Sequence, residues 1–304
     1  MSAARPFLHR IEAALVRGLV RMMSALPIAT ASWLGGKFAR LVGPLLPVSR
    51  KVGEANLRLA MPSLSPPERR AIIRQVWQNL GQTFTELANL RALIEVPAGS
   101  MAPGYCVTGW DEHVAPLLVP GKPAIFFTGH LANWEVMPVL AAKYGVNFGF
   151  MYRAASNQLV DETLCHLRRT GYKTDVKMFA KGAAGARAAY AHLSRGNVLG
   201  LLVDQKLNTG IDAPFFGKTA KTMDALAAFA LKFHCPVLPI HVRRLGPARL
   251  EVTCDPALSI VQTGDKQADI LALTCTMNQT LERWITAQPG DWLWLHRRWP
   301  KGTV

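Results

Sequence analysis

The stretch FFTGHLANWE, residues 126–135, joins an apolar run to a histidine and then to a carboxylate five positions later. Residues 123–128 have the apolar, β-favouring character of a buried strand, and residues 133–143 have a helical pattern. His130 therefore lies where the strand ends. Glu135 falls in the first helical turn, where a carboxylate suits the positive end of the helix dipole.

This spacing suits acid–base chemistry. An imidazole can take a proton from a hydroxyl, and a carboxylate bonded to its other nitrogen fixes the tautomer. Residues five apart on one helix diverge by about 140°, so the pair meets only if His130 lies in the preceding turn, which Gly129 makes accessible. We predict that His130 is a catalytic base oriented by Glu135. The alternative is a capping histidine beside a surface glutamate.

Strand-like and helix-like runs alternate along the rest of the chain, which predicts an α/β fold with a largely parallel central sheet flanked by helices. The expected strands are residues 123–128, 147–152, 175–179, 198–203, 236–242 and 249–254, and the expected helices are 133–143, 158–170, 183–195, 223–233 and about 266–287. Residues 1–90 have a helical character throughout. We therefore expect an N-terminal helical, membrane-interface segment (1–90) and one integrated α/β catalytic region (91–304).

Three reactive side chains, His130, Arg153 and Asp204, follow directly after expected strands. Ligands of open α/β sheets bind beyond the carboxyl ends of the strands, so these side chains are expected to converge on one cleft. Arg153 offers a planar fork that matches phosphate oxygens, although a surface salt bridge is the alternative. Asp204 ends a run too apolar for an unpaired charge, so it needs a partner such as an arginine or His130, unless it only caps a turn.

The helix after Arg153 adds a second expected cation. Asn157 and Arg168 are eleven residues apart, which places them about 20° from the same helix face. Arg168 is therefore a candidate for the same anion site, and a solvated basic helix face is the alternative.

The motif HLANWE resembles the H-x4-D/E signature of the glycerolipid acyltransferase superfamily, and FFTGHLANWE is most similar to its late lauroyl/myristoyl branch, the lipid A biosynthesis acyltransferases. Further blocks match in the same order, and together the resemblance covers about residues 51–299. These blocks are Tyr152-Arg153 with Asn157-Gln158-Leu159, Leu202-Val203-Asp204-Gln205, Phe215-Phe216-Gly217, and Trp292-Leu293-Trp294-Leu295-His296-Arg297-Arg298.

The resemblance implies an acyl group carried by acyl carrier protein as donor and a hydroxyl of a lipid A precursor as acceptor, with no acyl-enzyme intermediate. Backbone amides around Gly129 and at the start of the following helix, helped by a basic side chain, are expected to hold the oxyanion. Phe215 and Phe216 are expected to line an acyl tunnel, or else to pack in the core. The full set of expected substrate-binding residues is Arg153, Asn157, Arg168, Asp204, Gln205, Phe215 and Phe216.

The charge balance favours anionic partners. The 304 residues carry a net charge of +15, which is compatible with nucleic acid, anionic lipid or an acidic carrier protein. Residues 1–74 alone hold 12 Lys and Arg against three Glu. Charge alone does not choose among them, although no nucleic-acid recognition motif accompanies it; the acidic carrier is the partner that the resemblance implies, and the basic N-terminal segment predicts an anionic membrane surface. The alternatives are an acyl-CoA-dependent enzyme for another glycolipid or a lysophospholipid, and a non-catalytic basic surface protein.

The N-terminal segment is expected to lie in the membrane interface. Arg10, Arg17 and Arg21 line one side of a helical wheel, and apolar residues gather broadly opposite, except that Glu12 falls on the wrong side. Its longest uncharged run is shorter than the roughly 20 residues of a spanning helix. Residues 29–46 either dip into the bilayer or pack on the first helix, and a soluble helical hairpin is the alternative. We expect the cytoplasmic face of the inner membrane.

The five cysteines are scattered and show no metal-ligand spacing, and the chain has neither a phosphate-binding loop nor a dinucleotide fingerprint. No metal or cofactor is therefore expected. The alternation of Trp292, Trp294 and His296 predicts an extended segment with three rings on one face, either at the headgroup region or closing the sheet.

Overall fold

The computed structural model describes residues 4–172, 176–300, 302 and 303. Its centre is a seven-stranded sheet in the order β1-β9-β8-β2-β5-β3-β4, in which every neighbouring pair is parallel except β8 and β9. The predicted α/β fold with a largely parallel sheet is confirmed. The strands are β1 Gly104–Thr108, β2 Ala124–Thr128, β3 Phe148–Tyr152, β4 Lys177–Ala180, β5 Val198–Leu202, β8 Val237–Gly246 and β9 Arg249–Cys254.

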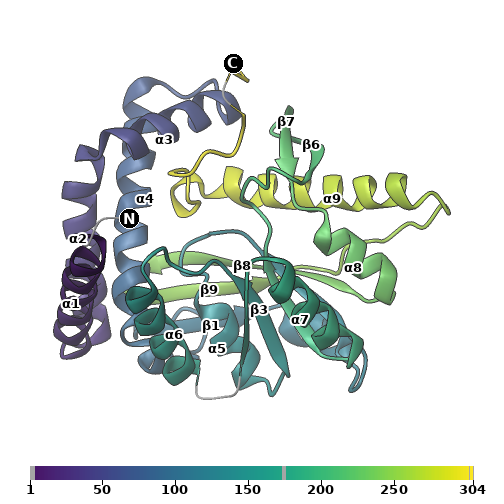
Figure 1. Cartoon of the computed structure of the whole chain (residues 1–304), viewed down its shortest axis with the longest axis horizontal. Helices are drawn as coiled ribbons and strands as arrows, with labels where there is room; N and C mark the ends of the chain where they lie inside the picture. The colour runs from purple at the N-terminus through teal and green to yellow at the C-terminus, as the bar shows by residue number, and fades with distance from the viewer. Residues whose placement is uncertain (1–3, 173–175, 301, 304) are drawn as a thin grey trace.

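Helices cover the sheet and one of its ends (Figure 1). Four of them precede the sheet, and the last, α9, is a long helix whose first turn is capped by the carboxylate of Asp265. The helices are α1 Ala4–Ser24, α2 Ile28–Val42, α3 Pro47–Ala60, α4 Pro66–Leu87, α5 Val136–Lys143, α6 Gln158–Tyr172, α7 Ala183–Ser194, α8 Ala225–Phe233 and α9 Lys266–Ala287. Short helical turns are η1 Gly43–Leu45, η2 Leu90–Ala92, η3 Trp110–Val114, η4 Ala115–Leu117 and η5 Pro289–Asp291.

Strand β2 is buried on both faces, which explains its uninterrupted apolar sequence. Ile125 and Phe127 belong to one core with residues of α7, α8 and α9. Ala124 and Phe126 point to the other face and belong to a second core with residues of α5. The sheet is therefore the middle layer between two hydrophobic cores, and the loop after β2 starts from a rigid position.

Some boundaries differ from the expected ones. Helix α5 begins at Val136, three residues later than expected, so Glu135 is its N-cap residue. The expected strand 175–179 is β4, which begins at Lys177, and Asp175 lies outside the described residues. Strand β1 and the hairpin of β6 Ile211–Phe215 and β7 Lys218–Thr222 were not predicted.

Helices α2 and α4 cross closely at glycines. A Cβ atom at Gly81 would lie only 2.3 Å from the carbonyl oxygen of Gly35, and one at Gly35 would lie 2.4 Å from the Thr85 side chain. Any larger residue at these positions would push the helices apart. This crossing fixes α2 against α4, whose other side faces the loop after β2.

The first two helices, the turn after them and the start of α3 leave many apolar side chains exposed. Helices α1 and α2 lie at the left of Figure 1. The expected apolar stripe of α1 is not covered by protein, and Arg10, Arg17 and Arg21 are exposed as well. None of the helices in the described part of the chain is long and apolar enough to cross a membrane. The exposed apolar residues are Phe7, Leu8, Ile11, Leu15, Leu19, Met22, Trp33, Leu34, Phe38, Leu41, Val42, Leu45, Leu46 and Val48.

Candidate active site

His130 follows β2 directly and is paired with the carboxylate of Asp204, which follows β5. The distance from His130 Nδ1 to Asp204 Oδ1 is 2.7 Å, and the His130 backbone N–H donates to Asp204 Oδ2 at 2.9 Å. The two residues come together because β2 and β5 are parallel neighbours, so their carboxyl ends lie at the same edge. The expectation that Asp204 needs a charged partner is confirmed, and that partner is the histidine.

Asp204 is fully buried and ionised. Burial raises the pKa of its carboxyl, but the adjacent His130 and the hydrogen bonds to it outweigh this effect, so the pKa lies well below its usual value. Trp292 adds a third donor, from its indole N–H to Asp204 Oδ2 at 2.7 Å. A carboxylate with this many donors stays negative and holds the Nδ1–H tautomer of His130.

The other ring nitrogen of His130 faces the cavity. Its Nε2 lies 3.2 Å from Gln205 Nε2, a contact in which the amide donates to the unprotonated nitrogen. The His130 ring also packs edge-on against Trp134, with centroids 4.9 Å apart, and its side chain is 14% exposed. A histidine with one nitrogen tied to a buried carboxylate and the other open to a cavity has the geometry of a general base.

The expected pairing of His130 with Glu135 is wrong. The Glu135 carboxylate is bound by Arg168, which donates from Nη2 at 2.6 Å and from Nε at 3.0 Å, and by the Tyr172 hydroxyl at 3.0 Å. The physical reason is the start of α5: as the N-cap residue, Glu135 is directed toward α6 rather than back toward the histidine. The charge of Arg168 is thus matched by Glu135, and burial and Glu135 together raise the pKa of Tyr172.

A cavity of about 320 Å³ opens beside His130, at the carboxyl ends of β2, β3 and β5. Much of its wall is apolar, with Phe126, Phe148, Phe150, Met137 and Leu201 among its residues. Basic side chains line it as well, which would suit an anionic group at the end of an apolar chain. These basic residues are Arg153, Lys181, Lys206 and the Glu135-bound Arg168.

The structure brings His130, Arg153, Arg168 and Gln205 to this one cavity, together with Glu135. The prediction that side chains after separate strands converge is therefore confirmed for His130, Arg153 and Asp204, the last through its bond to His130. Lys181 and Lys206 were missed by sequence reasoning. Lys206 directly follows the Asp204-Gln205 block, which was the available signal.

Asn157 does not face the cavity. It is buried, and its amide donates to the His9 carbonyl and to Glu12 Oε2, both at 2.8 Å, so it fastens α1 to the start of α6. The expectation that Asn157 contacts substrate is wrong. The same contact explains why Glu12 interrupts the basic and apolar pattern of α1.

Phe215 and Phe216 are also absent from the cavity wall. Phe215 is fully buried between Trp292 and Trp299, and Phe216 packs on Phe215 and Trp294. The core-packing alternative is therefore correct, and the acyl-tunnel expectation is wrong for this pair.

The backbone amides that follow Gly129 are engaged within the protein. Those of His130, Leu131 and Ala132 donate to Asp204 Oδ2, to the Gly129 carbonyl and to the Asp291 carbonyl. The expected oxyanion site at these amides is therefore not formed. Gln205 and the basic residues of the cavity remain as side-chain donors.

The segment after α9 packs beneath His130 and supports it. Trp292 and Trp294 are fully buried, so the headgroup expectation is wrong. In place of the expected extended segment closing the sheet, the chain here forms a single antiparallel bridge between Trp292 and Leu131. Leu293 donates to the His130 carbonyl at 3.1 Å. The ring of His296 lies 6.3 Å from that of His130, and burial lowers the pKa of His296, against the opposing effect of Asp204.

In the residues that the structure describes, no group of His, Cys, Asp and Glu side chains has the arrangement of a metal site. The polar side chains that line the cavity are those of His130, Gln205, Glu135, Thr128 and Tyr152, together with the cations named above.

Comparison with known proteins gives the family of the chain. Residues 2–301 match the family model described as bacterial lipid A biosynthesis acyltransferase. The chain is 21% identical over 298 residues to the lipid A biosynthesis palmitoleoyltransferase of Escherichia coli (strain K12), covering 92% of this chain and 88% of that protein. The lipid A biosynthesis acyltransferase of Shigella flexneri matches over the same length at the same identity. The chain belongs to the bacterial lipid A biosynthesis acyltransferase family.

Proposed function

We propose that this chain transfers a fatty acyl group from acyl carrier protein to a hydroxyl of a lipid A precursor, with His130 as the general base and Asp204 as its orienting carboxylate. The observation that carries the proposal is the Asp204–His130 hydrogen bond, which leaves His130 Nε2 directed at the cavity. The family membership supports lipid A as the acceptor class.

The reaction follows from this geometry. His130 Nε2 takes the proton of the acceptor hydroxyl as its oxygen attacks the thioester carbonyl, forming a tetrahedral intermediate. The carbon–sulfur bond then breaks, and the thiolate leaves with the proton that His130 holds. The products are an ester and a free thiol, and no bond to the protein is formed. Asp204 stabilises the imidazolium between the two proton transfers.

The lining of the cavity supports separate binding places for the acyl chain and for the charged groups of the substrates. Its apolar wall suits an acyl chain, and its basic residues suit the phosphates of a lipid A disaccharide or the charge that develops on the oxyanion. The net charge of +15 suits an acidic carrier protein as donor.

The function is tested with the purified protein and a lipid A precursor, supplied with acyl groups either on acyl carrier protein or on coenzyme A. Mass spectrometry is expected to show the precursor gaining one acyl mass, faster from the carrier protein. Preference for coenzyme A would overturn the proposed donor. Acylation of a lysophospholipid but not of the precursor would overturn the proposed acceptor. Transfer to neither lipid would overturn the proposal that this chain catalyses acyl transfer.

Arg153 is proposed to bind an acceptor phosphate, because it is exposed and lines the cavity beside His130. We expect Arg153→Lys to raise the apparent KM for the acceptor by about tenfold, since lysine keeps the charge but loses the bidentate fork. The KM for the donor should change little. Separate titrations of the two substrates measure this, and an effect confined to the donor would reassign Arg153 to the carrier or thioester.

We also propose that α1, α2 and η1 rest on the anionic cytoplasmic face of the inner membrane. The support is the group of exposed apolar side chains on these elements together with Arg10, Arg17 and Arg21. Their combination suits binding in the interface plane, where apolar side chains enter the headgroup boundary and arginines contact anionic lipid.

Changing Arg10, Arg17 and Arg21 together to Glu is expected to release most of the protein from membranes washed with high salt or alkaline carbonate. Each basic residue near an anionic surface contributes about 1 kcal/mol, so three reversals should be readily visible on immunoblots of the washed pellet. The matched control reverses three exposed basic residues elsewhere, Lys122, Arg187 and Arg195. Equal release of both variants would refute a specific role for α1, and resistance of both to extraction would indicate an inserted segment.

A further inference from the structure

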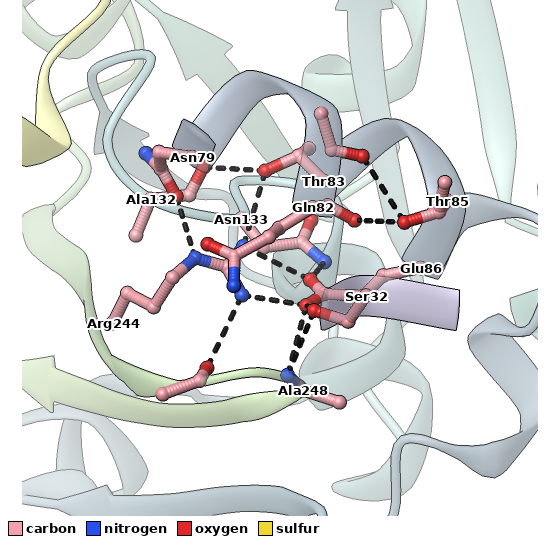
Figure 2. Close-up of polar contacts among 12 residues, drawn as sticks. Ser32, Asn79, Gln82, Thr83, Thr85, Glu86, Ala132, Asn133, Arg244 and Ala248 are labelled. Carbon is pink, nitrogen blue, oxygen red and sulfur yellow. Dashed lines mark hydrogen bonds and ion pairs between the residues drawn. The ribbon is translucent and has the colours of Figure 1, made fainter. Parts of the chain in front are cut away.

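A buried carboxylate on α4, Glu86, joins three separate parts of the chain (Figure 2). Its Oε1 accepts from the Ser32 hydroxyl of α2 at 2.6 Å and from the Ala248 backbone N–H at 3.0 Å. Its Oε2 accepts from the side-chain amide of Asn133 at 2.7 Å, and Arg244 of β8 binds both oxygens at 2.5 and 3.0 Å. Glu86 is fully buried, and Arg244 is nearly so.

One of these contacts reaches into the catalytic loop, residues 129–135. Asn133 donates to Glu86 through its Nδ2 and accepts from the Glu135 backbone N–H through its Oδ1, at 3.1 Å. The preceding residue, Ala132, has a φ of 45°, a left-handed conformation that side chains disfavour. Its carbonyl accepts from the Thr83 hydroxyl at 2.9 Å, and its N–H donates to the Asp291 carbonyl.

Arg244 links the Glu86 carboxylate to three further residues, Asn79, Thr83 and Asp291. Its Nε donates to Asn79 Oδ1 at 2.6 Å, its Nη2 to the Thr83 hydroxyl at 3.3 Å, and its backbone N–H to Asp291 Oδ2 at 3.1 Å. A buried ion pair is a weak source of stability, because removing two charges from water offsets most of their attraction. Its bonds are strongly directional, however, and here they reach two of the three residues between His130 and Trp134: Asn133 through Glu86, and Ala132 through Thr83.

We infer that Glu86, Arg244 and Thr83 are positioning residues for acyl transfer, which hold Ala132 of the catalytic loop in its left-handed conformation and so fix His130 against Asp204 and the cavity. The inference rests on the proposed function of His130. All three residues lie outside the cavity wall. A shift of the loop by about 1 Å would misalign His130 Nε2 with the acceptor hydroxyl, which is enough to cost a large rate factor.

Two threonines on the same helix provide a matched test. Thr83 donates to the catalytic loop, whereas Thr85 donates to the carbonyls of Gly81 and Gln82 in its own helix, and both are buried. Thr83→Val is expected to lower kcat by roughly ten- to a hundredfold with little change in KM. Thr85→Val should stay within about twofold of the wild-type kcat. Thr83→Ser restores the hydroxyl and should restore kcat.

The ion pair is tested by a double substitution that removes both of its charges. In Glu86→Gln/Arg244→Met, the fold is expected to persist, because both charges are removed together, but kcat should fall at least as far as in Thr83→Val. Hydrogen–deuterium exchange of peptides covering residues 129–135 supplies a readout that needs no substrate. Exchange should be faster in Thr83→Val and in the double variant, and unchanged in Thr85→Val.

Unchanged loop exchange in folded Thr83→Val and in the double variant would overturn the inference. So would a loss of kcat that followed the loss of thermal stability equally in Thr83→Val and Thr85→Val, with no rescue by serine. Failure of the wild type to acylate a lipid A precursor would instead overturn the proposed function, and the exchange experiment would still decide whether the network holds the loop.

Discussion

Replacing His130 with alanine is expected to lower kcat for acyl transfer by roughly a hundred- to ten-thousandfold. The change removes the ring nitrogen directed at the cavity and the Nδ1 bond to Asp204, while Asp204 keeps its hydrogen bonds from Trp292 and from the backbone of residue 130. The fold should therefore survive. Initial rates at saturating acceptor and donor, together with circular dichroism, measure the two effects separately.

The matched control for this variant is His166→Ala, because His166 is an exposed histidine on α6 outside the cavity wall. We expect it to have the wild-type rate. Near-normal turnover of folded His130→Ala would exclude His130 as the base, and equal losses in both histidine variants would point to an effect of the assay rather than of the site.

The sequence predicted the sheet well where the strands are buried. Strands β2 and β5 are short, almost entirely apolar runs, and such runs between turn residues are typical of buried strands in an α/β pattern. The hairpin of β6 and β7 was missed for the opposite reason. Pro214 interrupts β6, and β7 has the sequence KTAKT with only Ala220 and Thr222 buried, so neither shows strand-like hydrophobicity. Their pairing is set by packing on α9 rather than by local preference.

The sequence predicts only part of the candidate site. Topology could place His130 and Asp204 at one edge, because parallel neighbouring strands end together. Sequence proximity, however, favoured Glu135 as the partner of His130. The true arrangement depends on side chains distant in sequence, with Arg168 and Tyr172 of α6 engaging Glu135 and Trp292 supporting Asp204. No local pattern around residues 126–135 contains this information.

The network around Glu86 could not be predicted from the local sequence either. Its members come from α2, α4, the catalytic loop and β8, and individually they have the appearance of ordinary polar residues. The single available signal was the concentration of polar residues within α4. Only the tertiary fold reveals that they meet at Ala132 and Asn133.

The second large effect is expected from Asp204→Asn, which preserves shape but reverses the hydrogen-bonding pattern. Two donors, the His130 backbone N–H and the Trp292 indole, meet Oδ2, so the amide oxygen of the introduced asparagine would take that place. The NH2 group of the new side chain would then face His130 Nδ1, where it can only donate. Nδ1 would become the acceptor, and the ring proton would move to Nε2, the nitrogen that must be free to act as a base.

We therefore expect Asp204→Asn to lower kcat by about a thousand- to ten-thousandfold, as loss of the correct tautomer does in other histidine-based sites, with an unchanged KM.

The variant Glu135→Gln distinguishes the role of Asp204 from that of Glu135, the residue that the sequence predicted to orient His130. It leaves the His130–Asp204 bond intact but weakens the ion pair with Arg168, whose side chain is only 15% exposed. Its main effect should be on thermal stability, up to about 3 kcal/mol, and its kcat should exceed that of Asp204→Asn by at least about tenfold. If Glu135→Gln abolished turnover while Asp204→Asn preserved it, Glu135 would be the orienting acid, and the pairing of His130 with Asp204 would have no catalytic role.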